Sequence, residues 1–315
     1  MKKIDAPSKI VTVLGYGSQG RAMALNLRDS GWNVLVGLRR GSKSCNVARR
    51  DKFRQICTIS QAVAQADIVC FAFPDHLHGR VFKREIAKNL VPQSTLWFLH
   101  GMSVHFKFVV PPEDCDVILI APHAPGVAVR ENYLMKRPYS AFYAVFQDRS
   151  GNADKTTFQL AQAIGLHQRG LISTTFEAEA IGDMFGEQAV LCGGMTALIK
   201  NGFDVLVENG LSPENAYLEV ALQLDLIIDL IKKHGIEGML KRISVAARYG
   251  SLLSGPKIVD RSVKERMKKV YREIESGRFP RKLNTLTSSD VLRLNKAVKI
   301  LSVPALERAA KKFSK

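Results

Sequence analysis

The segment GDMFGEQAVLCGG, residues 182–194, places two carboxylates, Asp183 and Glu187, four positions apart. In a helix, side chains at i and i+4 lie on one face, where two like charges repel each other. The residues that follow, 189–194, are small and apolar enough to be buried, and carboxylates are poor candidates for burial without a partner. On an ordinary surface helix solvent would separate the two charges. If the helix is buried, the pair needs another partner.

A second candidate for chemistry is the glycine motif GYGSQG near the N-terminus, in which Gly15, Gly17 and Gly20 have the G-x-G-x-x-G spacing. The apolar run KIVTVL precedes it and the amphipathic pattern RAMALNLRDSG follows it, so a strand, a tight turn and a helix are expected in that order. Such a turn brings a pyrophosphate to the helix N-terminus, where unpaired N–H groups favour anions. The sequence therefore predicts a dinucleotide site at Gly15, Tyr16, Gly17, Ser18, Gln19 and Gly20.

The end of the next predicted strand indicates which dinucleotide binds. An acid there would hold the ribose 2′-hydroxyl of NAD, but the sequence reads GLRRGSKS. Guanidinium and hydroxyl groups suit a 2′-phosphate, so we expect NADPH. The candidate contacts are Arg39, Arg40, Ser42 and Ser44. The alternative is an ordinary basic surface loop.

These motifs need a scaffold, and the sequence predicts an α/β fold with two domains. Apolar strand-like runs alternate with helical patterns up to about residue 175, which is typical of a Rossmann-type, doubly wound parallel sheet with helices on both faces. The long apolar-striped patterns beyond it predict an all-helical domain. One helix there has Ser212 as N-cap, Pro213 at its first position and Gly235 at its end. We expect a cofactor domain over 1–175 and a helical domain over 176–315.

Several blocks together resemble ketol-acid reductoisomerase in its short, class I form. They are GYGSQGRAMALNLRDSG, HGMSVHF, APHAPGVAVRENY, TTFEAEAIGDMFGEQAVLCGG, GLSPENAYLEVALQLDLIIDL, ISVAARYGSLLSGP and VKERMKKVYREIESGRF, in one order from about residue 9 to residue 280. The resemblance implies a knotted helical domain, NADPH, two Mg²⁺ ions and a homodimer that shares helices across its active sites. It also implies the reaction: alkyl migration in a 2-acetolactate-type acid, followed by hydride reduction to a 2,3-dihydroxy acid of branched-chain amino-acid synthesis.

The resemblance offers an explanation for the opening acidic pair. Mg²⁺ prefers carboxylate and water oxygens, and a cation between Asp183 and Glu187 would offset their repulsion. Both residues fall on the family's first two ligand positions, and Glu219 falls on the first ligand of the second helix. The next ligand position, usually Glu, is Gln223 here, and a neutral amide binds Mg²⁺ more weakly. Ser244 falls on the hydroxyl that contacts substrate.

Two histidines complete the implied catalytic set. His100 matches the family's active-site histidine near the nicotinamide and the metal. His123 replaces a lysine, which is a permanent cation, whereas histidine is largely neutral at pH 7 unless paired. In addition, His78 stands where the family usually has Gln.

These differences from the family at Gln223 and His123 leave three possible functions. The first is an active NADPH- and Mg²⁺-dependent reductoisomerase that tolerates Gln223 and His123. The second is a 2-keto-acid reductase of the same fold that lacks the isomerisation, because reduction needs a polarised carbonyl but not the full charge of two metal sites. The third is a catalytically degenerate homologue that binds cofactor or nucleic acid.

Composition bounds the remaining possibilities. The 315 residues carry a net charge of +17, and residues 264–315 alone hold fifteen Lys/Arg against five Asp/Glu. Such a tail could attract nucleic acid, although no nucleic-acid module signature is present and a solvated basic helix face is the simpler interpretation. We expect a cytoplasmic protein: the five cysteines form no C-x-x-C pair, and neither a signal peptide at residues 1–7 nor a transmembrane run is expected.

Overall fold

The structure is a computed structural model that describes residues 8–314; residues 1–7, where no signal peptide was expected, lie outside this range. Contacts divide the chain into two compact units. Unit 1 comprises the residues up to Gly182 together with Pro280–Thr285, and unit 2 comprises Asp183–Phe279 and the residues from Leu286 onward. The chain therefore leaves unit 1, builds most of unit 2, and returns to unit 1 for one short segment.

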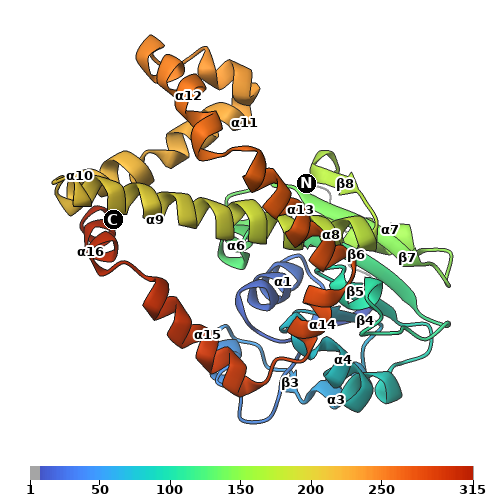
Figure 1. The fold of residues 1–315 in the computed structure, drawn as a ribbon. Coiled ribbons are helices and arrows are strands. Elements are labelled where there is room, and N and C mark those ends of the chain that lie inside the picture. Colours follow the sequence, from blue (N-terminus) through green and yellow to red (C-terminus); the bar gives the residue numbers. More distant parts are fainter. Residues whose placement is uncertain (1–7, 315) are drawn as a thin grey trace. The chain divides into compact units, whose positions relative to one another are not determined.

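Unit 1 contains a β-sheet with helices packed around it (Figure 1). Its eight strands lie in the order β3-β2-β1-β4-β5-β6-β7-β8. Every neighbouring pair is parallel except β6 and β7, which are antiparallel, so the expected all-parallel sheet carries one reversed pair. The short strands β3 and β8 were not expected from the sequence. The strands are β1 (Ile10–Leu14), β2 (Asn33–Gly37), β3 (Ile56–Cys57), β4 (Ile68–Phe71), β5 (Thr95–Phe98), β6 (Asp116–Pro122), β7 (Ala141–Gln147) and β8 (Leu171–Ser173).

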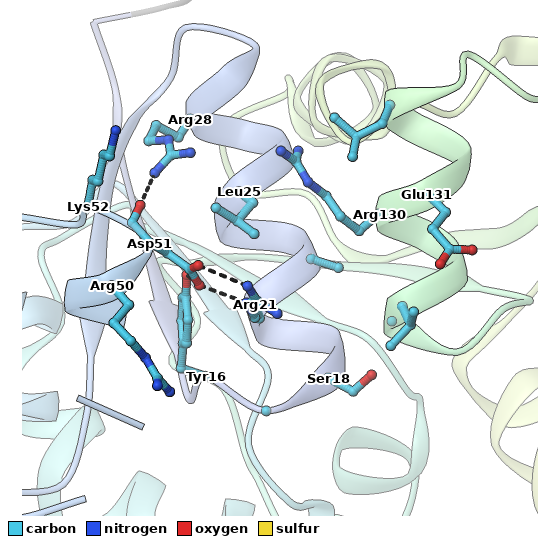
Figure 2. A pocket seen from close by; sticks show the side chains of 15 residues that line it. Tyr16, Ser18, Arg21, Leu25, Arg28, Arg50, Asp51, Lys52, Arg130 and Glu131 are labelled. Atoms are coloured by element: carbon cyan, nitrogen blue, oxygen red, sulfur yellow. Dashed lines mark hydrogen bonds and ion pairs between the residues drawn. The ribbon is translucent and has the colours of Figure 1, made fainter. Parts of the chain in front are cut away.

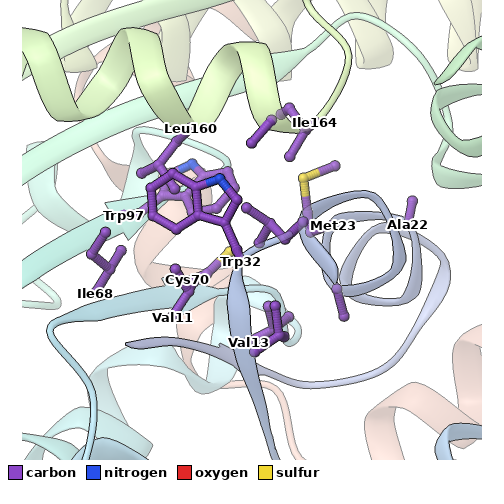
Figure 3. Close-up of a cluster of buried hydrophobic side chains, with 14 of the residues drawn as sticks. Val11, Val13, Ala22, Met23, Trp32, Ile68, Cys70, Trp97, Leu160 and Ile164 are labelled. Atoms are coloured by element: carbon purple, nitrogen blue, oxygen red, sulfur yellow. The ribbon is translucent and has the colours of Figure 1, made fainter. Parts of the chain in front are cut away.

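Alternation along the strands divides the apolar side chains between the two faces of the sheet. Ile68 and Cys70 of β4 join one buried cluster, whereas Val69 and Phe71 join the other. Both clusters also contain helical residues, so helices cover both faces. Figure 3 shows the first cluster, in which both tryptophans, Trp32 and Trp97, lie among aliphatic side chains from strands and helices. The helices of this unit are α1 (Ser18–Asp29), α2 (Ser44–Arg50), α3 (Ile59–Val63), α4 (His78–Val81), α5 (Met102–His105), α6 (Gly126–Leu134) and α7 (Ala153–Ala163).

Unit 2 is helical. Helix α10 begins as predicted, with Ser212 Oγ accepting a hydrogen bond from Asn215 N at 3.3 Å and Pro213 at the first position. The helical path breaks at Gly235, whose φ of 69° lies in the left-handed region that glycine favours. The C-terminal region forms two helices that are separated at Ser302. The helices are α8 (Phe176–Phe185, which bridges the two units), α9 (Gly193–Glu208), α10 (Pro213–Tyr217), α11 (Leu224–Leu240), α12 (Val245–Ile258), α13 (Arg261–Glu275), α14 (Arg278–Asn284), α15 (Ser288–Leu301) and α16 (Pro304–Phe313).

Many large apolar side chains on unit 2 are exposed in the single chain. Leu226 is 62% exposed and Leu252 is 61% exposed. In the segment 189–194, expected to be buried, only Ala189 is buried and residues 190–193 are exposed. The helical stretch Phe176–Glu208 is long and apolar enough to cross a membrane, judged by length and composition alone, although no such run was expected from the sequence. Unit 2 therefore presents an apolar surface that one copy of the chain does not cover.

Candidate functional site

A cavity of about 830 Å³ opens at the carboxyl ends of the central strands of unit 1. The strand order reverses direction between β1 and β4, and ligands of open α/β sheets bind in the crevice at such a switch point. The predicted residues that line this cavity are Gly15, Tyr16, Gly17, Ser18, Gln19, Arg39, Ser42, Ser44 and His100. The glycine turn and the end of β2 thus face the same space.

Each motif glycine has a separate geometric reason. Gly15 has a φ of 94°, and a Cβ there would lie 2.7 Å from Ala72 O. A Cβ on Gly20 would lie 2.4 Å from Gly15 O, so Gly20 lets α1 pack close to the turn without itself lining the cavity. A Cβ on Gly17 would have no atom within 4 Å, so the backbone of Gly17 borders open space. A dinucleotide pyrophosphate fits this turn because the backbone can approach it closely.

The glycine turn is held from behind by a residue that the sequence analysis did not single out. Tyr16 Oη donates to Asp51 Oδ2 at 2.9 Å, and Arg21 forms two bonds to the same carboxylate, at 2.7 and 2.9 Å (Figure 2). The hydrogen bond from Arg21 lowers the pKa of Asp51, and burial raises the pKa of Tyr16 well above its usual range. The phenol therefore stays protonated and keeps its donor. No sequence motif marks Asp51, which lies 35 residues after Tyr16.

The two arginines at the end of β2 occupy different environments. Both are exposed, but Arg39 lines the cavity together with Ser42 and Ser44, whereas Arg40 is not among the lining residues. A guanidinium and two hydroxyls at the cavity edge are suitable partners for a 2′-phosphate. On this geometry Arg39 has the more direct access to a bound dinucleotide.

His100 lies at the cavity wall after β5, and the residue that follows it is bonded to a buried side chain, Glu179. Its Nδ1 accepts a hydrogen bond from Met102 N at 3.1 Å, so in the neutral ring the proton is on Nε2. Glu179 of α8 is only 3% exposed and accepts a hydrogen bond from Gly101 N at 2.5 Å. A Cβ on Gly101 would lie 2.2 Å from Phe176 O, which explains the glycine. Sequence reasoning missed Glu179, although it lies one helical turn before Asp183.

The two substituted histidines have distinct settings. His78 is buried, with Nδ1 2.9 Å from Ser103 Oγ and Nε2 2.9 Å from Phe73 O, and burial lowers its pKa. It therefore ties the loop after β4 to α5 as a neutral ring. His123 follows β6, is exposed, and places Nδ1 3.1 Å from Ser140 Oγ. It does not line the cavity.

The predicted metal ligands lie in unit 2, on two helical regions that share an unusual feature. Asp183 is on α8 and Glu187 is in the π-helical segment η5 (Gly186–Leu191), while Glu219 is in a second π-helical segment, η6 (Leu218–Leu222). Such segments are rare and often mark functional sites. Gln223 Nε2 donates to Glu219 Oε2 at 3.4 Å, so these two side chains share one face. All four side chains are exposed.

The donor set suits a hard cation but is divided between two helical regions. Carboxylate and amide oxygens are what Mg²⁺ prefers. Among residues 8–314 no group of three or more His, Cys, Asp or Glu side chains lies close enough to hold a metal ion. Ser244, predicted to contact substrate, is exposed and caps α12, its Oγ accepting from Ala247 N at 3.1 Å. A metal centre built from these residues would therefore need ligands from both helical regions.

Comparison with known proteins identifies the family. Residues 6–170 match the family model for the acetohydroxy acid isomeroreductase NADPH-binding domain, and residues 176–313 match that for the ketol-acid reductoisomerase C-terminal domain. Ketol-acid reductoisomerases (NADP(+)) from Pyrobaculum aerophilum and Pyrococcus abyssi are 48% and 47% identical over 271 residues, 86% of this chain and 82% and 81% of the relatives.

A solved structure agrees with these matches. The structure of an NADH-preferring ketol-acid reductoisomerase from an uncultured archaeon has a TM-score of 0.91 and 35% identity, covering 99% of this chain and 96% of that one. A Plasmodium falciparum pyrroline carboxylate reductase is only 15% identical, with a TM-score of 0.55, and shares the fold alone. The matches cover both predicted domain types in the expected order, and the chain belongs to the ketol-acid reductoisomerase family.

Proposed function

We propose that the chain is an NADPH-dependent ketol-acid reductoisomerase, which rearranges a 2-acetolactate-type acid and reduces the product to a 2,3-dihydroxy acid. The observation that carries this proposal is the similarity to NADP(+)-dependent relatives over 86% of the chain. The cavity supports it, because the glycine turn, Arg39 and His100 face one space. The substrate is accordingly a small-molecule keto acid.

The cofactor domain performs the binding steps. The turn from Gly15 to Gly20 accepts the pyrophosphate, and Arg39 with the two neighbouring serines holds the 2′-phosphate. His100 has its proton on Nε2 in the neutral ring, so it can donate a hydrogen bond to a substrate oxygen. Such a bond stabilises the negative charge that grows on a carbonyl oxygen as hydride arrives. We assign the predicted domains, residues 1–175 and 176–315, to cofactor binding and to substrate binding respectively.

We further propose that Asp183, Glu187, Glu219 and Gln223 hold Mg²⁺, with Ser244 and His123 near the substrate. When bound, Mg²⁺ supplies Lewis-acid polarisation of the substrate carbonyl and hydroxyl. The chain supplies oxygen ligands, three of them charged. Metal binding is testable apart from catalysis. We expect Gln223→Glu to tighten Mn²⁺ binding measured by electron paramagnetic resonance, whereas unchanged affinity would exclude this side chain from the site.

We also propose that the chain is a cytoplasmic homodimer and that the second copy covers the apolar surface of unit 2. The alternative cover for Phe176–Glu208 is a bilayer, but Asp183 and Glu187 on this stretch would be costly there. Light scattering of detergent-free protein should give twice the 34.9 kDa chain mass. A protein that needs detergent to remain dispersed would contradict this assignment.

One experiment separates the three readings of the departures at Gln223 and His123. NADPH consumption is measured with Mg²⁺ on 2-acetolactate and on 3-hydroxy-3-methyl-2-oxobutanoate, the migrated intermediate. Turnover of both establishes the reductoisomerase. Turnover of the intermediate alone establishes the 2-keto-acid reductase, and Gln223→Glu with His123→Lys should then restore the migration. No turnover together with salt-sensitive nucleic-acid binding would establish the degenerate homologue.

A further inference from the structure

A second pocket, of about 860 Å³, lies against the glycine turn on unit 1 (Figure 2). It is bordered by α1, by α6 and by the turn that follows α2, and every residue that lines it belongs to unit 1. Tyr16, Gly17 and Ser18 border both this pocket and the cofactor cavity. Arg39, Ser42 and Ser44, the proposed 2′-phosphate contacts, do not line it. The pocket is therefore adjacent to the cofactor site but distinct from it.

The pocket lining has an excess of positive charge. It contains five cationic side chains, Arg21, Arg28, Arg50, Lys52 and Arg130, and only two carboxylates, Asp51 and Glu131. A third carboxylate just outside the lining, Asp29, bonds both Arg28 and Arg130. Even with Asp29 included, cations outnumber carboxylates by two.

The unbalanced charge is at one end of the pocket. Arg21 is bound to Asp51, and Arg28 donates to the Asp51 carbonyl at 2.6 Å and lies over the ring of Phe53. The side chains of Arg50 and Lys52, in contrast, make no hydrogen bond or ion pair with any residue between 8 and 314, and both residues are exposed. Figure 2 shows them on either side of Asp51. Two cations beside a cavity are a suitable binding point for an anion with more than one charge.

The rest of the pocket surface is apolar. Leu25 and Ala22 of α1 are buried at its floor, while Val127 and Leu134 of α6 are 64% and 59% exposed at its rim. Large apolar side chains at such exposure, beside a cationic end, match a ligand that has both an anionic group and an apolar part.

We propose that this pocket binds a small organic anion of at least two negative charges, with its charged end between Arg50 and Lys52 and its apolar part against Leu25 and Leu134. Phosphate esters and polycarboxylates share this chemistry. The site is independent of the proposed activity, because none of its charged residues belongs to the cofactor, metal or catalytic sets.

The test uses full-length protein saturated with NADPH, so that the cofactor cavity is occupied. Inorganic pyrophosphate and citrate are titrated separately by isothermal calorimetry in magnesium-free buffer. The test variant Arg50→Glu/Lys52→Glu is compared with Arg49→Glu/Arg54→Glu, which makes the same change in charge at exposed cations outside the pocket. A neutral variant, Arg50→Gln/Lys52→Gln, removes the same two positive charges without adding negative ones, in case the double Glu variant misfolds. Each variant's affinity for NADPH reports whether unit 1 is intact.

We expect wild-type protein to bind at least one probe. The pocket variant should lose at least about tenfold in affinity, since two charge-assisted contacts are removed, and the neutral variant should lose less. The control should lose no more than about threefold, the effect of net charge at a distance. Tighter binding of pyrophosphate would assign a phosphate ester, and tighter binding of citrate a polycarboxylate. Absence of binding of both probes at about 1 mM, or equal losses in the pocket variant and the control, would overturn the proposal.

Discussion

His78 should make the stability of unit 1 depend on pH, and the effect can be isolated by His78→Gln. The His78 ring is 1% exposed, and both of its nitrogens have hydrogen-bond partners. Burial lowers the pKa of the ring, although Asp75 Oδ1, 3.7 Å from Nδ1, acts in the opposite direction. In the unfolded chain the same ring takes up a proton below its ordinary pKa of about 6.5. The unfolded state then binds more protons than the folded state. Stability from the neutral ring is therefore fully present above about pH 6.5 and decreases as the pH falls.

The magnitude follows from the linkage slope of about 1.4 kcal/mol per pH unit. If the folded ring remains neutral, acidification from pH 7 to pH 5 lowers the free energy of unfolding by about 2 kcal/mol through this residue alone. His78→Gln removes the titrating group and keeps an amide that can bond Ser103 or the Phe73 carbonyl. The other histidines and the carboxylates are unchanged, so they contribute equally to both proteins.

The assay is urea denaturation at pH 7, 6 and 5, followed by tryptophan fluorescence. Both tryptophans, Trp32 and Trp97, are buried in unit 1, so the signal reports on the unit that contains His78. Wild-type protein should lose more stability than His78→Gln between pH 7 and pH 5, by up to about 2 kcal/mol. His167→Gln, at an exposed ring of the same unit, should follow wild type. Equal losses in wild type and His78→Gln would refute the reasoning.

Three further predictions test the geometry of unit 1. Gly126→Ala places a Cβ 2.2 Å from Ser18 backbone atoms and should lower the free energy of unfolding by roughly 3–5 kcal/mol in the same urea assay. Gly182→Ala is the control: its Cβ would have no atom within 4 Å, so the free energy of unfolding should change by less than about 1 kcal/mol. Glu179→Gln replaces a buried hydrogen-bond acceptor that is 3% exposed and should cost about 1–3 kcal/mol; an unchanged urea midpoint would show that this carboxyl group is not important for packing. Arg39→Ala should weaken NADPH binding at least about tenfold and leave NADH binding unaltered, while Arg40→Ala, outside the cavity, should have little effect; equal effects in a fluorescence titration would contradict the assignment.

Local patterns predicted those parts of the structure that depend on nearby residues. The glycine turn, the central strands, the Ser212 cap and the break at Gly235 each follow from a short stretch of sequence, because turn conformation and side-chain periodicity are local properties. The antiparallel pairing of β7 with β6 was not predicted, because an apolar run has the same periodicity in either direction.

The parts of the candidate site that depend on distant residues were not visible in the sequence. Asp51 supports the glycine turn and Glu179 supports the residue after His100, but each is separated from its partner by at least 35 positions. A single carboxylate in a helical pattern has no distinguishing signal. The expected burial of residues 189–194 was wrong: only Ala189 is buried, because apolar composition alone does not determine whether a helix face is covered.

The return of the chain to unit 1 at Pro280–Thr285 has a consequence for synthesis and proteolysis. When the ribosome has released the chain only as far as Gly182, the whole sheet of unit 1 is present but Pro280–Thr285 is not. Unit 1 is therefore completed about a hundred residues after its final strand. In the finished protein, a protease cut in the exposed region between α11 and α12 leaves each fragment holding part of unit 2, and the later fragment also holds part of unit 1. The two fragments should therefore remain together on a sizing column and separate only in denaturant.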